Sequence, residues 1–236
     1  MSMKPILFNT DMVKAILEGR KSCTRRIIKS SQIMGVHPNG VRECTPGEFL
    51  KDKSDMFEPY CDMTDSELVL ETYKKPYRPG DILYVRETWE RFECWNCEGD
   101  ERENCPKEPK KSVLDKTCGC YMYRATDEIS GDAKWHPSIH MPKRAARIWL
   151  KVTDVRVEQL QDITEEGAST EGSIDNRGFI HSYDNEYTHI HTAREDFAEI
   201  WNSTIKKSDL DFYGWDANPY VWVIEFERCD KPESEG

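Results

Sequence analysis

A group of cysteines in the middle of the chain has the density and spacing of a metal site. The chain has nine cysteines among 236 residues, and five of them fall between positions 94 and 120. Two are separated by only two residues, and such a turn presents two thiolates to one ion. Zinc takes four ligands of this kind in a tetrahedron, so we predict a structural zinc site here. The candidate ligands are Cys94, Cys97, Cys105, Cys118 and Cys120.

Free thiols in a loop are the alternative for this segment. Cys94, Cys97 and Cys105 are the preferred ligands, and the choice between Cys118 and Cys120 stays open. An odd total of cysteines does not suit a framework of disulfides, and a reducing compartment disfavours disulfides as well. We therefore expect ordinary thiols at the scattered positions Cys23, Cys44, Cys61 and Cys229.

Basic residues gather in two stretches of an otherwise acidic chain. The formal net charge is −11, which disfavours binding to long duplex DNA. Residues 1–36 hold seven Lys and Arg against two acids, and residues 133–151 hold five and no acid. Local basic patches on an acidic protein favour a small anionic or nucleotide-like ligand. Two solvated surface faces are the alternative.

Composition and terminal sequence indicate a cytoplasmic protein without membrane contact. No stretch approaches the roughly 18 apolar residues of a membrane span, and the N-terminus lacks a secretory pattern. Apolar residues make up 37% and charged residues 33%, which predicts a modest core with long polar insertions. No motif for an organic cofactor is evident.

Strands and helices alternate without regular β–α–β spacing, which favours an α+β fold. A first strand over 6–8 leads to a helix that Asn9 and Thr10 can cap and Gly19 can end. Alternation predicts strands over 82–87, 121–125, 147–157 and 220–226, the third with a bulge or turn near Thr153 and Asp154. Capping boxes predict helices after Asp162 and Thr192.

We expect one domain over residues 1–228, followed by a flexible acidic tail over 229–236. Polar stretches at about 29–76, 92–120 and 173–191 are predicted insertions in that domain.

Four segments resemble the ASCH family in both sequence and order. Residues 16–26 contain Gly-Arg-Lys-x-x-Thr, and residues 77–87 contain Pro-Gly-Asp before a strand. The others are residues 152–165, from Val-Thr-Asp-Val to Asp-Ile-Thr-Glu, and the closing Trp-Val-Ile-Glu-Phe of residues 222–226. The longer phage-associated members look most similar, through the Trp-His-Pro segment that begins at Trp135.

The resemblance implies a PUA-like fold, a small partly open β-barrel with flanking helices and a cleft suited to nucleosides or RNA. Small bacterial members remove the acetyl group from N4-acetylcytidine with a lysine, a threonine and a glutamate. Lys21 and Thr24 match the first two residues of this set. Glu171 matches the third by its distance from the Ile-Thr-Glu segment, and Glu165 is the alternative.

These residue types suit amide hydrolysis. Thr24 is a weak nucleophile unless a base removes its proton, and Lys21 can be that base only if its pKa falls. Neighbouring arginines favour such a fall, and Glu171 can orient the lysine or carry a proton to the leaving amine. Cys23 beside Thr24 and the greater length distinguish this chain from the small enzymes. Candidate ligand-binding residues are Arg20, Arg26, Arg86 and Arg147 for oxygens, and Tyr84, Trp89 and Trp135 for stacking on a base.

Three functions stay open at this point. The first is an amidohydrolase that deacylates an N4-acetylcytidine-like substrate. The second is a non-catalytic module that binds RNA or a modified base in the same cleft. The third is a zinc-stabilised interaction protein. His136 and His140 are four residues apart, but Pro137 between them argues against a helical metal pair.

Overall fold

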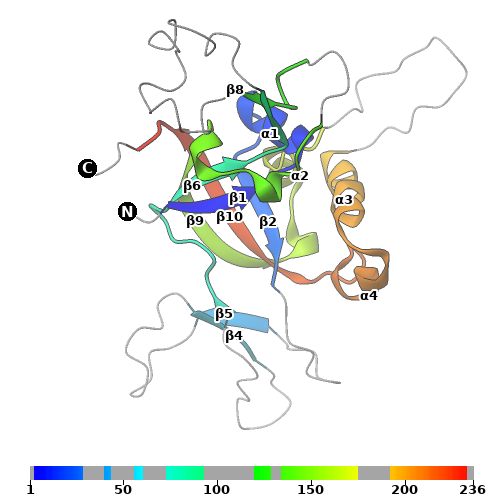
Figure 1. The fold of residues 1–236 in the computed structure, drawn as a ribbon. Coiled ribbons are helices and arrows are strands. Elements are labelled where there is room, and N and C mark those ends of the chain that lie inside the picture. The colour runs from blue at the N-terminus through cyan, green and yellow to red at the C-terminus, as the bar shows by residue number, and fades with distance from the viewer. Residues whose placement is uncertain are drawn as a thin grey trace, which may run out of the picture. The chain divides into compact units, whose positions relative to one another are not determined.

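The structure is a computed structural model that describes residues 3–28, 40–43, 56–60, 73–92, 120–128, 134–174 and 192–232. Its strands are β1 (Met3–Leu7), β2 (Cys23–Ile27), β3 (Gly40–Glu43), β4 (Met56–Tyr60), β5 (Tyr73–Lys74), β6 (Ile82–Arg86), β7 (Trp89–Phe92), β8 (Cys120–Tyr123), β9 (Trp149–Gln159) and β10 (Tyr220–Cys229). Its helices are α1 (Thr10–Leu17), α2 (Glu165–Thr170), α3 (Ala193–Thr204) and α4 (Leu210–Tyr213). The mixed α+β class is therefore confirmed (Figure 1).

The described strands form three sheets. One has five strands in the order β1-β6-β9-β10-β2, and the others are β3-β4-β5 and the pair β7-β8. Within the described ranges β1 and β2 are the edges of the larger sheet, and no pairing between them closes it into a barrel. The small sheet β3-β4-β5 lies in the stretch that the sequence marks as the first insertion.

The chain divides into two compact units. The first unit comprises Met1–Ser2, Gly19–Ile82 and Lys151–Arg228, and the second comprises Met3–Glu18, Leu83–Leu150 and Cys229–Gly236. The single-domain organisation stays a prediction. Among the described residues, no helix is both long enough and apolar enough to cross a membrane.

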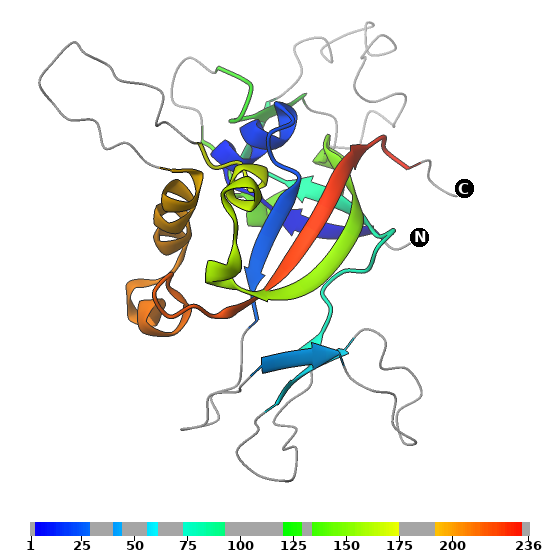
Figure 2. The same cartoon turned by 180° about the vertical axis from the view of Figure 1, so that it is seen from behind.

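In the first unit, β9, β10 and β2 lie side by side (Figure 2). Strand β10 pairs antiparallel with β2, from Glu225 opposite Cys23 to Val221 opposite Ile27. One hydrophobic core joins these two strands to α2 and α3. Its buried members are Cys23, Leu160, Ile163, Ala168, Ala193, Phe197, Trp201, Val221 and Val223.

Two sequence expectations for these strands need correction. Strand β9 runs without a break through Thr153 and Asp154, so a turn there is wrong, although burial still changes register between Val152 and Val155. Alternation over 220–226 predicts one buried face, whereas strand β10 is buried on both faces, because Val221 and Val223 pack into the helix-facing core.

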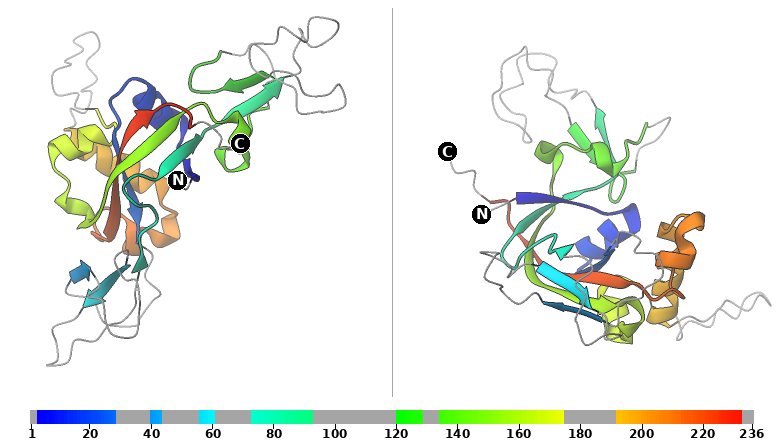
Figure 3. Two further views of the ribbon diagram at one scale, coloured as in Figure 1. Left: turned by 90° about the vertical axis from the view of Figure 1, so that its left-hand side faces the viewer. Right: turned by 90° about the horizontal axis from the view of Figure 1, so that it is seen from below.

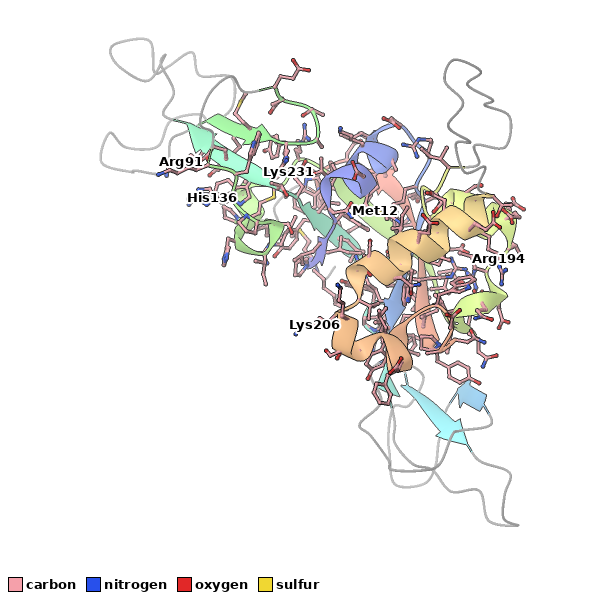
Figure 4. The ribbon with its side chains drawn as sticks, turned by 90° about the vertical axis from the view of Figure 1, so that its right-hand side faces the viewer. Met12, Arg91, His136, Arg194, Lys206 and Lys231 are labelled. Carbon is pink, nitrogen blue, oxygen red and sulfur yellow. The ribbon has the colours of Figure 1, made fainter. Side chains whose placement is uncertain are left out.

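The helix caps follow the sequence closely, with one shift. Asn9 accepts a hydrogen bond from the Met12 amide at 2.9 Å and begins α1, as predicted. Thr192 and Glu195 form the predicted capping box of α3. The cap of α2 is Thr164 rather than Asp162, because residues 160–162 form a 3-10 turn and the helix begins later. Arg194, at the start of α3 (Figure 4), donates to main-chain oxygens of that turn region.

The second unit contains α1 and the antiparallel hairpin of β7 and β8 (Figure 3). The hairpin pairs Trp89 with Tyr123 at one end and Phe92 with Cys120 at the other. A small core of Tyr121, Met141 and Ala145 packs against Trp89. Phe92 and Cys120, which pair with each other, are the described residues on either side of positions 93–119.

Candidate functional site

Lys21 and Glu171 are in direct contact although 150 residues separate them. Lys21 lies just before β2, and Glu171 caps the C-terminus of α2. The Lys21 Nζ atom is 2.6 Å from Glu171 Oε2 and 2.7 Å from the main-chain oxygen of the same residue. The two side chains are 0% and 3% exposed. The resemblance to the ASCH family selected both residues, and the structure brings them together.

The end of α2 fixes the position of Glu171. Gly172 has a φ of 95°, a left-handed conformation that glycine adopts without the penalty of a side chain. The Ser173 amide donates to the Ala168 oxygen at 3.2 Å, and the Gly172 amide donates to the Ser169 oxygen at 2.9 Å. These two bonds form a Schellman motif, which closes the helix and leaves the Glu171 carbonyl for Lys21.

The segment before β2 docks on this helix end through consecutive residues. Arg20 Nη1 donates to the Gly172 oxygen at 3.0 Å, and the Ser22 amide donates to the Thr170 oxygen at 2.9 Å. Two cations therefore lie at a helix C-terminus, where the exposed carbonyls favour positive charge. The sequence Arg-Lys-Ser is thus matched to the α2 terminus by both hydrogen bonds and charge.

Burial lowers the pKa of Lys21, and the Glu171 carboxylate only partly opposes this effect. A neutral amine has two hydrogens and one lone pair. Glu171 offers two acceptors to Lys21 Nζ, its carboxylate and its main-chain oxygen. Both hydrogens of a neutral amine can therefore be donated to Glu171. This arrangement can serve as a general base.

Arg25 extends the pair into a chain of alternating charges. Its Nη1 atom lies 3.3 Å from Glu171 Oε1, and its Nη2 atom lies 3.0 Å from Glu158 Oε2. Glu158 in turn binds Arg156, which also contacts Asp154 on the same strand and Glu225 on β10. The chain runs from the enclosed Lys21 to Arg156, whose side chain is 40% exposed.

Thr24, the third residue of the predicted set, is not part of this network. It is 4% exposed and lies on β2, where successive side chains point to opposite faces. It therefore faces away from its neighbours Cys23 and Arg25. In the described part of the chain, no hydrogen bond joins its hydroxyl to Lys21 or Glu171. The structure thus brings together two of the three predicted catalytic residues.

Cys23 is expected to resist alkylation in the folded protein. Burial and then the negative charge of Glu171 raise the pKa of this thiol to about 12. At pH 8 its thiolate fraction is roughly 10³-fold below that of an ordinary cysteine. Treatment with iodoacetamide followed by peptide mass spectrometry measures this, with the half-buried Cys229 as internal control. Rapid modification of Cys23 before unfolding would contradict the assigned environment.

A pocket of about 300 Å³ lies next to the pair in sequence and space. Two of its lining residues follow Lys21 directly, and one precedes Glu171. Hydroxyl groups, one carboxylate and one aromatic ring make it suitable for a polar ligand with hydrogen-bond donors. The lining residues are Ser22, Cys23, Thr153, Thr170, Glu225 and Phe226.

The predicted ligand-binding residues are divided between the units. Arg20 and Arg26 belong to the first unit and are exposed. The second unit contains the other five, which are Tyr84, Arg86, Trp89, Trp135 and Arg147. Only the two arginines near Lys21 therefore belong to the site described above.

Contacts within the second unit already engage most of its candidates. Arg147 binds the buried Glu87 through two hydrogen bonds of 2.9 Å and lies over the Tyr123 ring. Arg86 donates to the main-chain oxygens of Met141 and Ile139. Both guanidinium groups would have to exchange these partners in order to bind a ligand.

The aromatic candidates are only partly covered. Trp89 packs against His136, with ring centroids 5.1 Å apart. The ring centroids of Tyr84 and Trp149 are 6.1 Å apart. Trp135 is half-buried. His136 and Arg91 can be followed in Figure 4, and His136 Nε2 lies 3.5 Å from Glu90 Oε1.

The predicted zinc ligands lie almost entirely outside the described residues. Cys94, Cys97, Cys105 and Cys118 fall there, whereas Cys120 begins β8. Within the described ranges, no group of three or more histidine, cysteine or acidic residues is arranged to hold a metal ion. His140 is the last residue of a 3-10 turn (Ser138–His140) and His136 precedes that turn, so the two histidines do not share the face of one helix.

The chain matches no family model, no curated protein and no solved structure. The resemblance to the ASCH family therefore stays a prediction that rests on its motifs.

Sequence reasoning missed the role of Arg25 and Glu158 in this site. In the sequence, Arg25 is only one of several positively charged residues near Lys21. Its alternation with Cys23 along β2 is the one signal that places it on the helix-facing side. Nothing in the sequence around Glu158 connects it to Arg25, because their contact depends on how the strands pair.

Proposed function

We propose that the first unit is an amidohydrolase that deacylates an N4-acylated cytosine nucleoside, such as N4-acetylcytidine. The observation that carries this proposal is the enclosed contact between Lys21 and Glu171. Two residues chosen from separate motifs of one family meet as that family's chemistry requires. The lowered pKa of Lys21 supports its role as a base. A PUA-like arrangement around the five-stranded sheet is part of the same proposal.

The proposed reaction has two stages. The Thr24 hydroxyl adds to the acyl carbon while Lys21 Nζ takes its proton, and the carbon–nitrogen bond then breaks as Lys21 returns the proton to the leaving amine. Water next adds to the threonine ester, Lys21 again takes the proton, and acetate leaves as Thr24 regains its hydrogen. Glu171 holds the lysine in place throughout.

The enclosure of Lys21 imposes a condition on this reaction. Its side chain is 0% exposed, so a ligand cannot touch it in the conformation described. The pocket wall next to Lys21 and Glu171 includes Ser22 and Thr170. We expect ligand binding to displace this wall, because a reacting group must come within hydrogen-bond distance of the base.

A second candidate is a module that binds RNA or a modified base without catalysis. The absence of a hydrogen bond between Thr24 and Lys21, within the described residues, favours it. In that case the buried charges would stabilise the fold, and the exposed Arg20 and Arg26 would contact the ligand. A zinc-stabilised interaction protein is the remaining alternative, and a cytoplasmic location is proposed for all three.

One panel assay separates the candidates. The full chain is incubated with N4-acetylcytidine, N4-acetylcytosine and a longer N4-acyl homologue, and products are separated by chromatography. Release of cytidine or cytosine with the matching acid supports the hydrolase. Intact substrate that is retained by the protein in equilibrium dialysis supports the binding module. If neither occurs, both nucleoside-directed candidates are wrong.

We also propose a structural zinc ion in the cysteine segment. The pairing of Phe92 with Cys120, the described residues on either side of this segment, supports the proposal. Cys94, Cys97 and Cys105, with either Cys118 or Cys120, would hold the ion. When bound, it would supply cross-links in place of a hydrophobic core and no chemistry.

Purified full chain is expected to contain about one zinc per molecule. Elemental analysis measures the content, and a chromophoric chelator measures its release. The double variant Cys94→Ser/Cys97→Ser should lose the metal, whereas Cys229→Ser should retain it. Metal-free wild-type protein with an unchanged melting temperature would contradict the proposal.

A further inference from the structure

Arg25 is a buried cation placed between two carboxylates. Its side chain is 3% exposed, and its two terminal nitrogens reach Glu171 at 3.3 Å and Glu158 at 3.0 Å. The guanidinium carbon also lies 6.0 Å from the centre of the Phe197 ring. Glu158 is 24% exposed and is shared with Arg156, so it is a weaker partner than the enclosed Glu171.

Both oxygens of the Glu171 carboxylate are therefore occupied. Lys21 binds Oε2, and Arg25 binds Oε1 from β2. Contacts on both oxygens fix the plane of the carboxylate, and with it the direction in which Lys21 is held. One enclosed negative charge is also shared by two potential cations. Guanidinium does not lose its proton in proteins, whereas a buried lysine does so readily.

The arrangement of Arg25 is not the most favourable one for the arginine itself. Its Nε atom is buried and makes no hydrogen bond with any described residue. A buried donor without a partner is unfavourable. The orientation of the guanidinium therefore follows the two carboxylates rather than the full hydrogen-bonding capacity of the side chain.

We propose that Arg25 is a positioning residue: it fixes Glu171 against Lys21 and competes with Lys21 for the negative charge of that carboxylate. The consequence is that Lys21 gives up its proton more readily than it would beside Glu171 alone. Its effect on turnover rests on the hydrolase proposed above, but its effect on Lys21 does not. Among the described residues, the charged and titratable groups that act on Lys21 are Glu171 from α2 and Cys23 and Arg26 from β2, and Arg25 acts through Glu171.

The test is an NMR titration of Lys21 in the full chain, labelled with ¹³C-lysine. The Lys21 signal is assigned by its absence from Lys21→Met. In Arg25→Met, Glu171 would be left to Lys21 alone, so we expect the Lys21 pKa to rise by about one unit or more. Glu158→Gln removes the second partner of Arg25 and should shift the Lys21 pKa in the opposite direction.

A matched control is Arg194→Met. Arg194 lies over the Trp215 ring and binds main-chain oxygens, but it contacts neither Lys21 nor Glu171 among the described residues. It should leave the Lys21 pKa unchanged. An unchanged pKa in both Arg25→Met and Glu158→Gln would overturn the inference, and so would an equal shift in the control. If Arg25→Met does not fold, the Lys21 pKa is measured in Arg25→Lys and Glu158→Gln instead.

Turnover distinguishes this inference from the proposed function. With an active wild type, the pH at which turnover reaches half its maximum should rise in Arg25→Met by the same amount as the Lys21 pKa. Arg25→Lys, which keeps a cation, should recover part of this shift. If the wild type does not turn over but the Lys21 pKa still responds, the positioning role stands and the hydrolase proposal fails. If the wild type is active but the Lys21 pKa does not respond to these substitutions, the hydrolase proposal stands and the positioning role fails.

Discussion

Substitution of Glu171 by alanine is expected to lower the free energy of unfolding by about 3–5 kcal/mol. Lys21 and Arg25 would remain enclosed without the carboxylate that they share, and an unpaired buried charge is costly. Denaturant unfolding at pH 7, followed by tryptophan fluorescence, measures the change. A loss below about 1 kcal/mol would show that the pair is solvated and would contradict its burial.

Two further variants control this prediction. The apolar double variant Lys21→Met/Glu171→Leu removes both charges, and such replacements of buried pairs are often neutral or stabilising. It should therefore recover the part of the loss that comes from Lys21, whereas Arg25 keeps only the partly exposed Glu158 as its partner. A matched surface pair is Lys151 with Glu227, whose side chains are 48% and 58% exposed. Glu227→Ala should change stability by no more than about 0.5 kcal/mol.

Lys21→Met is expected to reduce kcat for N4-acetylcytidine by about 10²- to 10⁴-fold, the usual contribution of a general base. Methionine keeps most of the volume of the lysine stem but cannot accept a proton. Wild-type activity should rise with pH as Lys21 loses its proton, at a pH below the ordinary lysine value because burial lowers its pKa. Initial rates over a pH series, with circular dichroism to confirm folding, measure both effects.

Lys151→Met is the control for charge removal, because that lysine lies in the exposed pair. It should leave kcat within about twofold of the wild type. Thr24→Val should reduce turnover as strongly as Lys21→Met if threonine is the nucleophile. Full activity of Thr24→Val together with loss in Lys21→Met would instead assign the attack to a water molecule that Lys21 activates.

Local sequence signals were sufficient to predict helix ends whose capping hydrogen bonds join residues close together in the sequence. The capping box of Thr192 and Glu195 and the Asn9 cap of α1 were both predicted, because their partners lie within four residues. The start of α2 was misplaced because a 3-10 turn precedes it. Which of two nearby capping residues begins a helix depends on the turn that comes before it.

The candidate site was predictable only in part. The pair of Lys21 and Glu171 came from the family resemblance, since nothing in the spacing of two residues 150 apart predicts their contact. Arg25 and Glu158 came only from the structure, because their meeting requires β2, α2 and β9 in their final positions. The burial of Val221 and Val223 was missed for the same reason. A strand covered on both faces cannot be recognised from alternation.

The most direct test of the account is turnover of N4-acetylcytidine by the apolar double variant Lys21→Met/Glu171→Leu beside the wild type. The variant separates catalysis from stability, because the two apolar side chains can maintain the fold without a base. We predict wild-type turnover, a double variant that folds but is less stable because Arg25 loses Glu171, and no measurable release of cytidine by that variant. Equal turnover by a folded double variant, or none by the wild type, would contradict the assignment of Lys21 and Glu171 to an active site.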